Sequence, residues 1–258
     1  MVSDLEGKVA IVTGGGSGVG SAIGLALAAA KASVCLIGRT RRHLESVANE
    51  VHCRGGIAYV YPTDIANDAE LDALVRTLER EHGRADILVQ NAAIHHSASV
   101  EKAALADLDL HYRTNLRAPY ALTQELLPML KAQRGQVVFI NSSSGVSAKP
   151  MTSQYDATKH ALRAFADSLR GEVNAAGIRV TSVYLGRTAS EMQRNIHQAG
   201  KMPYQPERML QPEDIASVVL NCLMLPPTAE VTDIHIRPMI PNAAPIRHEK
   251  SRLQLELR

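Results

Sequence analysis

A short run of β-branched residues leads directly into a glycine-rich turn near the start of the chain. Val9–Val12 has the character of a strand, residues 13–20 read Thr-Gly-Gly-Gly-Ser-Gly-Val-Gly, and the alanine-rich stretch after them has helical character. Glycines at such a turn let the backbone approach a pyrophosphate, and the helix N-terminus favours an anion. The sequence therefore predicts a strand, a nucleotide-binding turn and a helix; a glycine-rich turn without a ligand is the alternative.

The alternation of strand and helix continues along the chain. Further strands are predicted at 34–37, 57–61, 87–89, 137–140, 180–184 and 231–236, with helical stretches between them. This order indicates a parallel sheet covered by helices on both faces, a doubly wound α/β fold of the Rossmann type, with ligands at the carboxyl ends of the strands. We expect one domain over residues 1–240. The irregular segment 188–212 is predicted to form a lobe over the substrate, and residues 241–258 a tail of unassigned role.

Composition and charge narrow the class of protein and of partner. Hydrophobic residues make up 45% and charged residues 21% of the 258, which is ordinary for a globular protein. The net charge of +2 is too small to indicate a nucleic-acid or membrane surface, so we expect small-molecule partners. The N-terminus lacks the apolar core of an export peptide, and the three cysteines suit a reducing cytoplasm. No metal is predicted, because neither the cysteines nor the adjacent His95 and His96 have the spacing of metal ligands.

The end of the second predicted strand carries a basic residue where an acidic one would select NAD. An Asp or Glu about 20 residues after the glycine turn holds the ribose 2′-hydroxyl of NAD. Gly38 stands at that position, and Arg39 follows it. Because a guanidinium binds a 2′-phosphate through paired, charge-assisted hydrogen bonds, the sequence predicts NADP. A solvated basic helix start is the alternative, above all for Arg41 and Arg42.

Tyr155 and Lys159 are four residues apart in a segment with helical character. This spacing puts the phenol and the ammonium on one helix face, about 6 Å apart at Cβ. A tyrosine with a pKa near ~10 is a poor acid or base at neutral pH, so a cation that favours the phenolate suits proton transfer. An exposed Tyr and Lys is the alternative, and the upstream glycine turn favours the catalytic interpretation.

Together the glycine turn and the Tyr-Lys pair resemble the single-domain short-chain dehydrogenase/reductase family, over about residues 5–237. The resemblance implies a seven-stranded parallel sheet of order 3-2-1-4-5-6-7. Two positions depart from the family pattern: Ala93 replaces a usual glycine, and Leu185 replaces a usual proline, which puts cofactor affinity in doubt. Further matches are Asp64 and Ile65 after the third strand, Asn91 and Ala92 after the fourth, Asn115, and Ser142 after the fifth.

The resemblance also implies roles for these residues. Tyr155 would exchange a proton with the substrate oxygen while hydride moves between substrate and nicotinamide, and Ser142 would hydrogen-bond the same oxygen. Lys159 would contact the nicotinamide ribose and depress the pKa of Tyr155, and Asn115 would position a water that links Lys159 to solvent. The implied protein is a cytoplasmic, homo-oligomeric (dimeric or tetrameric) NADP-dependent carbonyl reductase or alcohol dehydrogenase. The implied cofactor contacts are Gly14, Gly16, Ser17, Gly18, Val19, Gly20, Arg39, Asp64, Ile65, Asn91, Ala92, Tyr155, Lys159, Gly186 and Thr188.

Two other functions are compatible with the same residues. A non-catalytic NADP-binding sensor or regulator would share the fold, and a 3-oxoacyl carrier protein reductase would share the chemistry. The segment 230–239 lacks the Gly-Gly ending usual in such reductases and looks more like reductases and dehydrogenases of the 3-hydroxy acid, serine or clavulanic-aldehyde type. The sequence leaves open whether Arg187 contacts a cofactor phosphate, an acidic substrate or solvent. It also leaves open whether Tyr184 and Met192 line the pocket or belong to the core.

Overall fold

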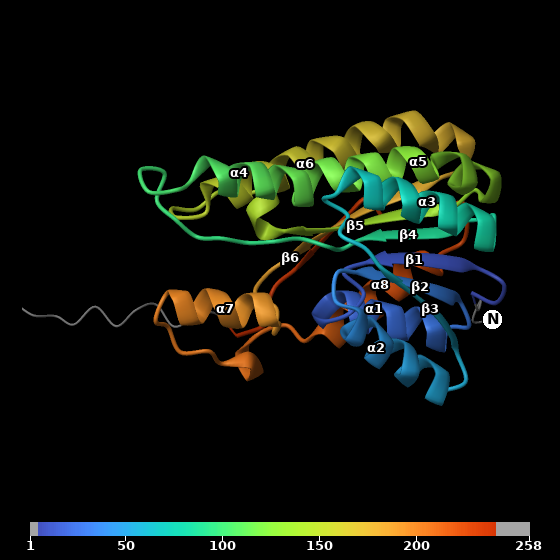
Figure 1. Ribbon diagram of the computed structural model, residues 1–258, viewed down its shortest axis with the longest axis horizontal. Helices are drawn as coiled ribbons and strands as arrows, with labels where there is room; N and C mark the ends of the chain where they lie inside the picture. Colours follow the sequence, from blue (N-terminus) through green and yellow to red (C-terminus); the bar gives the residue numbers. More distant parts are fainter. Residues whose placement is uncertain (1–4, 241–258) are drawn as a thin grey trace, which may run out of the picture.

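The computed structural model describes residues 5–240, and a parallel sheet of seven strands forms its centre (Figure 1). The strands follow the order β3-β2-β1-β4-β5-β6-β7, and every neighbouring pair is parallel. The predicted fold class and strand order are confirmed, although the last strand begins two residues later than expected. The tail 241–258 lies outside the described residues. The strands are β1 (Val9–Thr13), β2 (Ser33–Gly38), β3 (Ile57–Pro62), β4 (Ile87–Gln90), β5 (Gln136–Ser142), β6 (Arg179–Leu185) and β7 (Asp233–Ile236).

Helices cover both faces of the sheet and bury two separate apolar cores (Figure 1). The central strands β1 and β4 are buried along their whole length, which explains why they read as continuous apolar runs and not as alternating patterns. One layer consists of α1 (Gly18–Ala29), α2 (Arg41–Cys53) and α8 (Pro212–Leu223). The other consists of α3 (Asp68–His82), α4 (Leu105–Tyr112), α5 (Ala118–Gln133) and α6 (Ser153–Val173). No helix in either layer, or elsewhere in residues 5–240, is long and apolar enough to cross a membrane.

The segment 188–212 is less irregular than its sequence predicts. It contains α7 (Glu191–Ala199), which extends past the carboxyl ends of the strands, and a 3₁₀ turn, Pro206–Arg208 (Figure 1). The Ser190 hydroxyl accepts a hydrogen bond from the Gln193 amide at 3.2 Å and caps the helix. Because α7 is short and mostly polar, it lacks the strong apolar period that reveals longer helices.

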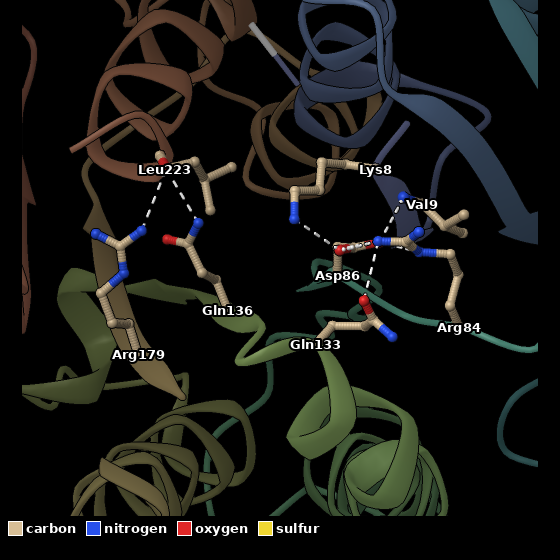
Figure 2. A network of polar contacts seen from close by, with 8 residues as sticks. All are labelled: Lys8, Val9, Arg84, Asp86, Gln133, Gln136, Arg179 and Leu223. Carbon is tan, nitrogen blue, oxygen red and sulfur yellow. Dashed lines mark hydrogen bonds and ion pairs between the residues drawn. The ribbon is translucent and has the colours of Figure 1, made fainter. Parts of the chain in front are cut away.

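A polar network fastens the opposite edge of the sheet, where the strands begin (Figure 2). Asp86, just before β4, has a side chain only 3% exposed. Its carboxylate accepts hydrogen bonds from Arg84 Nε at 2.8 Å, from Lys8 Nζ at 3.1 Å and from the Val9 amide at 2.9 Å. Arg84 also donates to the Gln133 side chain on α5 at 3.0 Å. The opposite edge, at the carboxyl ends of the strands, is therefore the edge available to a ligand.

Candidate active site

A cavity of about 860 Å³ lies at the carboxyl ends of the strands. Its wall is built by the glycine turn after β1, the loops that follow the next strands, and α7. All the residues predicted to form the site line this cavity except Gly20 and Asn115. The structure therefore brings together residues that lie as far apart in the sequence as Gly14 and Thr188.

The glycine turn leaves the first amides of α1 without a hydrogen-bond partner among residues 5–240. Gly14 has a φ of 66°, and a Cβ added at Gly20 would lie 2.2 Å from the Gly14 carbonyl oxygen, so a side chain cannot be placed at either position without strain. Ser17 precedes α1 without a side-chain cap, and the first turn of α1 holds no acidic residue. By contrast, the Asn67 side chain caps α3. The start of α1 is thus suited to a pyrophosphate.

The end of β2 brings one arginine to the cavity. A Cβ at Gly38 would lie 3.3 Å from the Leu44 side chain, so little room exists for an acidic side chain there. Arg39 is exposed and lines the cavity. Of the two arginines that follow, Arg41 pairs with Glu45 at 3.5 Å, and neither lines the cavity. The structure separates Arg39 from its basic neighbours.

Asn91 is bound to the glycine turn through its side chain. Its amide nitrogen donates to the carbonyl oxygens of Thr13 at 3.0 Å and Gly14 at 3.3 Å. The Thr13 hydroxyl accepts in return from the main-chain amides of Asn91 at 2.9 Å and Ala92 at 3.1 Å. These bonds hold the loop after β4 against the turn after β1, so that both line the cavity. Asp64, two residues after the end of β3, also lines the cavity.

Helix α6 directs Tyr155 and Lys159 toward the end of β5. Both side chains are buried, and the Lys159 ammonium lies 5.7 Å from the centroid of the Tyr155 ring. Lys159 Nζ donates to the Ile140 carbonyl oxygen at 3.2 Å. Ser142 ends β5, and its hydroxyl accepts from the Ser144 amide at 3.1 Å. Ser142, Tyr155 and Lys159 all line the cavity.

Burial moves the two ionisable groups of α6 in opposite directions. It raises the pKa of Tyr155 to about 12, while a hydrogen bond with Ser142 lowers this pKa and the Asp156 carboxylate raises it further. Burial also lowers the pKa of Lys159 to about 8. The net shift of Tyr155 is upward, opposite to the direction that the family resemblance implies, because the desolvation of a phenolate outweighs its neighbours. The phenol therefore keeps its proton at neutral pH.

Two histidines pack edge-on against the Tyr155 ring. The ring centroid of His95 lies 4.6 Å and that of His111 6.4 Å from the centroid of Tyr155. His111 Nε2 accepts from the His96 amide at 3.0 Å, and Nδ1 lies 2.7 Å from the Asp107 carbonyl oxygen, so the proton belongs on Nδ1. Burial lowers the pKa of both His95 and His111. His95 lines the cavity.

Asn115 supports the cavity from behind. It lies in a π-helical turn, Arg113–Arg117, between α4 and α5, and is 1% exposed. Its side chain accepts from the Ile94 amide at 2.8 Å and donates to the Ile94 carbonyl at 3.0 Å and to the Thr158 hydroxyl at 3.2 Å. These bonds join the loop after β4 to α6. The Asn115 side-chain amide is therefore occupied by protein groups.

The comparison with known proteins decides the family. A sequence model of the family described as short chain dehydrogenase matches residues 8–201. The chain belongs to the short-chain dehydrogenase family. An uncharacterized oxidoreductase of Staphylococcus aureus is 32% identical to it over 238 residues, which cover 91% of this chain and 99% of the relative.

Solved structures of short-chain dehydrogenases have the same fold. A metagenomic short-chain oxidoreductase in complex with NADP has a TM-score of 0.80 and 27% identity, and the match covers 91% of this chain and 99% of the other. A dehydrogenase/reductase from Sinorhizobium meliloti has a TM-score of 0.80 and 29% identity over 91% and 95% of the two chains. The protein is thus an oxidoreductase of this family with an NAD(P)-binding Rossmann fold.

The two departures from the short-chain dehydrogenase pattern have different surroundings. Ala93 lines the cavity, so its methyl group faces the space that the glycine would leave. Leu185 is buried in the core and pairs with Ile236 of β7, and the Gly186 amide donates to the Ile236 carbonyl at 2.7 Å. Leu185 keeps the main-chain amide that a proline lacks. The turn is therefore held by strand pairing, whereas in the usual family sequence the proline ring restricts it.

Several residues at the cavity were missed or left undecided by sequence reasoning. Ser190 lines the cavity, and a helix N-cap two residues after Thr188 was the available signal. Met192 lines the cavity, whereas Tyr184 is buried and stacks on His235 with ring centroids 4.6 Å apart. Further cavity residues that the sequence did not single out are Lys149, Thr152, Glu191, Gln193, Asn195 and Ile196.

Proposed function

We propose that this short-chain dehydrogenase is an NADP-dependent oxidoreductase that interconverts a ketone or aldehyde with the corresponding alcohol, with Tyr155 as the acid and base. The observation that supports this most is the meeting of Ser142, Tyr155 and Lys159 at one end of a cavity whose other end is the glycine turn. A fold without chemistry would not require a buried Tyr and Lys on the same helix face.

The residues of the other half of the cavity suit the cofactor. The free amides at the start of α1 would hold the pyrophosphate, and Arg39 would bind the 2′-phosphate. Asp64 and Ile65 would lie beside the adenine, Asn91 beside the adenosine ribose, and Gly186 and Thr188 beside the nicotinamide. When bound, NADPH supplies the hydride for reduction and NADP⁺ accepts it in oxidation.

The chain's own residues would control the proton. Tyr155 is protonated at neutral pH, so its hydroxyl would donate the proton to the carbonyl oxygen in reduction. Ser142 would hydrogen-bond the same oxygen and hold it near the phenol. Lys159, buried beside Tyr155, would stabilise the phenolate that remains, and Asn115 would keep α6 and the loop after β4 in register. Oxidation reverses these steps.

Removal of the phenol hydroxyl tests the proposal. In Tyr155→Phe, we expect turnover to fall by at least about 10³-fold, a loss in the range of general acid–base effects, with NADPH affinity within about twofold of the wild type. NADPH fluorescence titration measures the affinity, and a panel of aldehydes, ketones and 3-oxo acids measures turnover. Turnover close to the wild-type rate would exclude Tyr155 as the proton donor. NADPH binding without oxidation by any panel member in the wild-type protein would favour a sensor.

The proposal includes a cytoplasmic homo-oligomer, a dimer or tetramer. Large apolar side chains are exposed on α4 and α5, among them Tyr112 at 50% and Tyr120 at 49%, and a second copy of the chain would cover them. Size-exclusion chromatography with light scattering measures the mass in solution. A monomer would contradict this part of the proposal.

A further inference from the structure

Arginines that are partly buried elsewhere in this protein have acceptors for their guanidinium groups. Arg179 donates from Nη1 to the carbonyl oxygens of Leu225 at 3.0 Å and Ala229 at 2.9 Å. Its Nη2 donates to the Leu223 carbonyl oxygen at 3.4 Å, as Figure 2 shows. Arg84 binds the Asp86 carboxylate, as Figure 2 also shows. Since a guanidinium taken from water needs such partners, this is the expected pattern.

Arg187 departs from this pattern. It is half-buried and lines the cavity, yet its guanidinium makes no hydrogen bond and no ion pair with any of the residues 5–240. Burial lowers the pKa of Arg187, and the positive charge of Arg208 lowers it further. An anion in the cavity would supply the missing acceptor.

The position of Arg187 places this anion at the reacting end of the cavity. The register of the sheet pairs Ser142 of β5 with Leu185 of β6, and Arg187 follows two residues later. Arg187 lies in the bend that follows β6, and an extended course, with strands about 4.8 Å apart and about 3.3 Å per residue, would put its Cα atom roughly 8 Å from that of Ser142. A guanidinium starting there reaches a group a few bonds away from a carbonyl held by Ser142.

The cofactor phosphates have other partners on the far side of the cavity. Three strand spacings, roughly 14 Å, separate β6 from β1, where the glycine turn begins. Ser190, three residues after Arg187, lies beside that turn, because its Cβ is 3.6 Å from a Cβ built on Gly18. Arg187 precedes this approach to the glycine turn, and we therefore place it on the side of the cavity near β5, beside the expected position of the reacting oxygen.

We propose that Arg187 binds an anionic group of the substrate, and that this short-chain dehydrogenase acts on small oxo and hydroxy acids. The inference rests on the proposed function, because the carboxylate is placed relative to a carbonyl oxygen held by Ser142 and Tyr155. Lys149 also lines the cavity and adds positive charge, and Glu191 is the acidic residue of α7 that lines it. A carboxylate one to three carbons from the reacting carbon fits this separation.

Binding measurements test the inference without requiring turnover. The NADP⁺-saturated protein is titrated calorimetrically with 2-, 3- and 4-hydroxy acids and with the matching uncharged amides. We expect at least one acid to bind about tenfold more tightly than its amide, and this preference to disappear in Arg187→Gln. Arg194→Gln is the matched control, because Arg194 lies on α7, over the Tyr204 ring and outside the cavity, and this variant should keep the preference.

Kinetics and cofactor affinity separate the possible outcomes. For any oxo acid that is reduced, we expect kcat/KM to fall about tenfold or more in Arg187→Gln, while the methyl ester of that acid changes less than twofold. A weaker NADP⁺ or NADPH affinity in Arg187→Gln would assign Arg187 to a cofactor phosphate and overturn the inference. Equal binding of every acid and its amide by the wild type would also overturn it. Failure of the proposed function differs from both, since it appears as a lack of NADPH binding or of any turnover.

Discussion

Lys159 should make the protein less stable at neutral pH than an uncharged residue of the same shape would. Its side chain is 2% exposed, and burial lowers its pKa from 10.5 to about 8. A shift of this size corresponds to about 3 kcal/mol by the relation of about 1.4 kcal/mol per pKa unit. In Lys159→Met the charge is removed and the aliphatic part is retained. Loss of the hydrogen bond to the Ile140 carbonyl oxygen offsets about 1 kcal/mol of this stabilisation. We therefore expect the free energy of unfolding of Lys159→Met to exceed that of the wild type by about 2 kcal/mol.

The pH dependence of this gain distinguishes charge from packing. Below pH 8 Lys159 is charged in both the folded and the unfolded chain, so burial of its charge destabilises the folded chain by the full amount. Between about 8 and 10.5 the folded chain releases the proton first, and stability rises with pH. Urea unfolding of the wild type and Lys159→Met, without cofactor, measures the difference at pH 7 and pH 10. A variant that is less stable at pH 7, or a difference independent of pH, would refute the reasoning.

Three further predictions concern the cofactor, the proton and the sheet edge. Arg39→Ala should weaken NADPH binding at least tenfold more than NADH binding, with Arg41→Ala as the control; fluorescence titrations with equal losses for both cofactors would contradict the role of Arg39. Because burial holds the pKa of Tyr155 near 12, kcat/KM for alcohol oxidation should rise with pH between 6 and 9 while that for carbonyl reduction does not, and parallel profiles would argue against Tyr155. Asp86→Asn should lower the free energy of unfolding by about 2 kcal/mol at pH 7 and by less near pH 3. The reason is that hydrogen bonds and ion pairs from Arg84 and Lys8 hold the pKa of Asp86 below its usual 3.8. Urea unfolding that shows no loss of stability at pH 7 would contradict this prediction.

The local sequence was sufficient for most of the fold. β-branched runs such as Val9–Val12 are buried on both faces of a parallel sheet, and the glycines after it are required by the turn itself. The last strand was predicted two residues too early, and α7 was missed, because neither has a strong apolar period. The ends of helices, and short polar helices such as α7, depend on caps. In α7 the Ser190 hydroxyl caps the first turn by accepting a hydrogen bond from the Gln193 amide.

In the candidate site, too, some features follow from the local sequence and others from contacts between residues far apart in the chain. The four-residue spacing of Tyr155 and Lys159 on a helix determines that both point to one side, whatever surrounds them. The net direction of the Tyr155 pKa shift is different, because it depends on how deeply α6 is buried against β5. The roles of His95 and Asn115 likewise depend on contacts between the loop after β4 and α6.

The sequence by itself determined the glycine turn, the alternation of strands and helices and the Tyr-Lys pair, since each follows from residues that are neighbours in the chain or share one helix face. Only the tertiary structure decided that Arg187 lines the cavity without an acceptor and that Tyr184 belongs to the core. Desolvation and hydrogen-bond satisfaction are set by residues far apart in the chain, and they exist only once β5, β6 and α7 have come together.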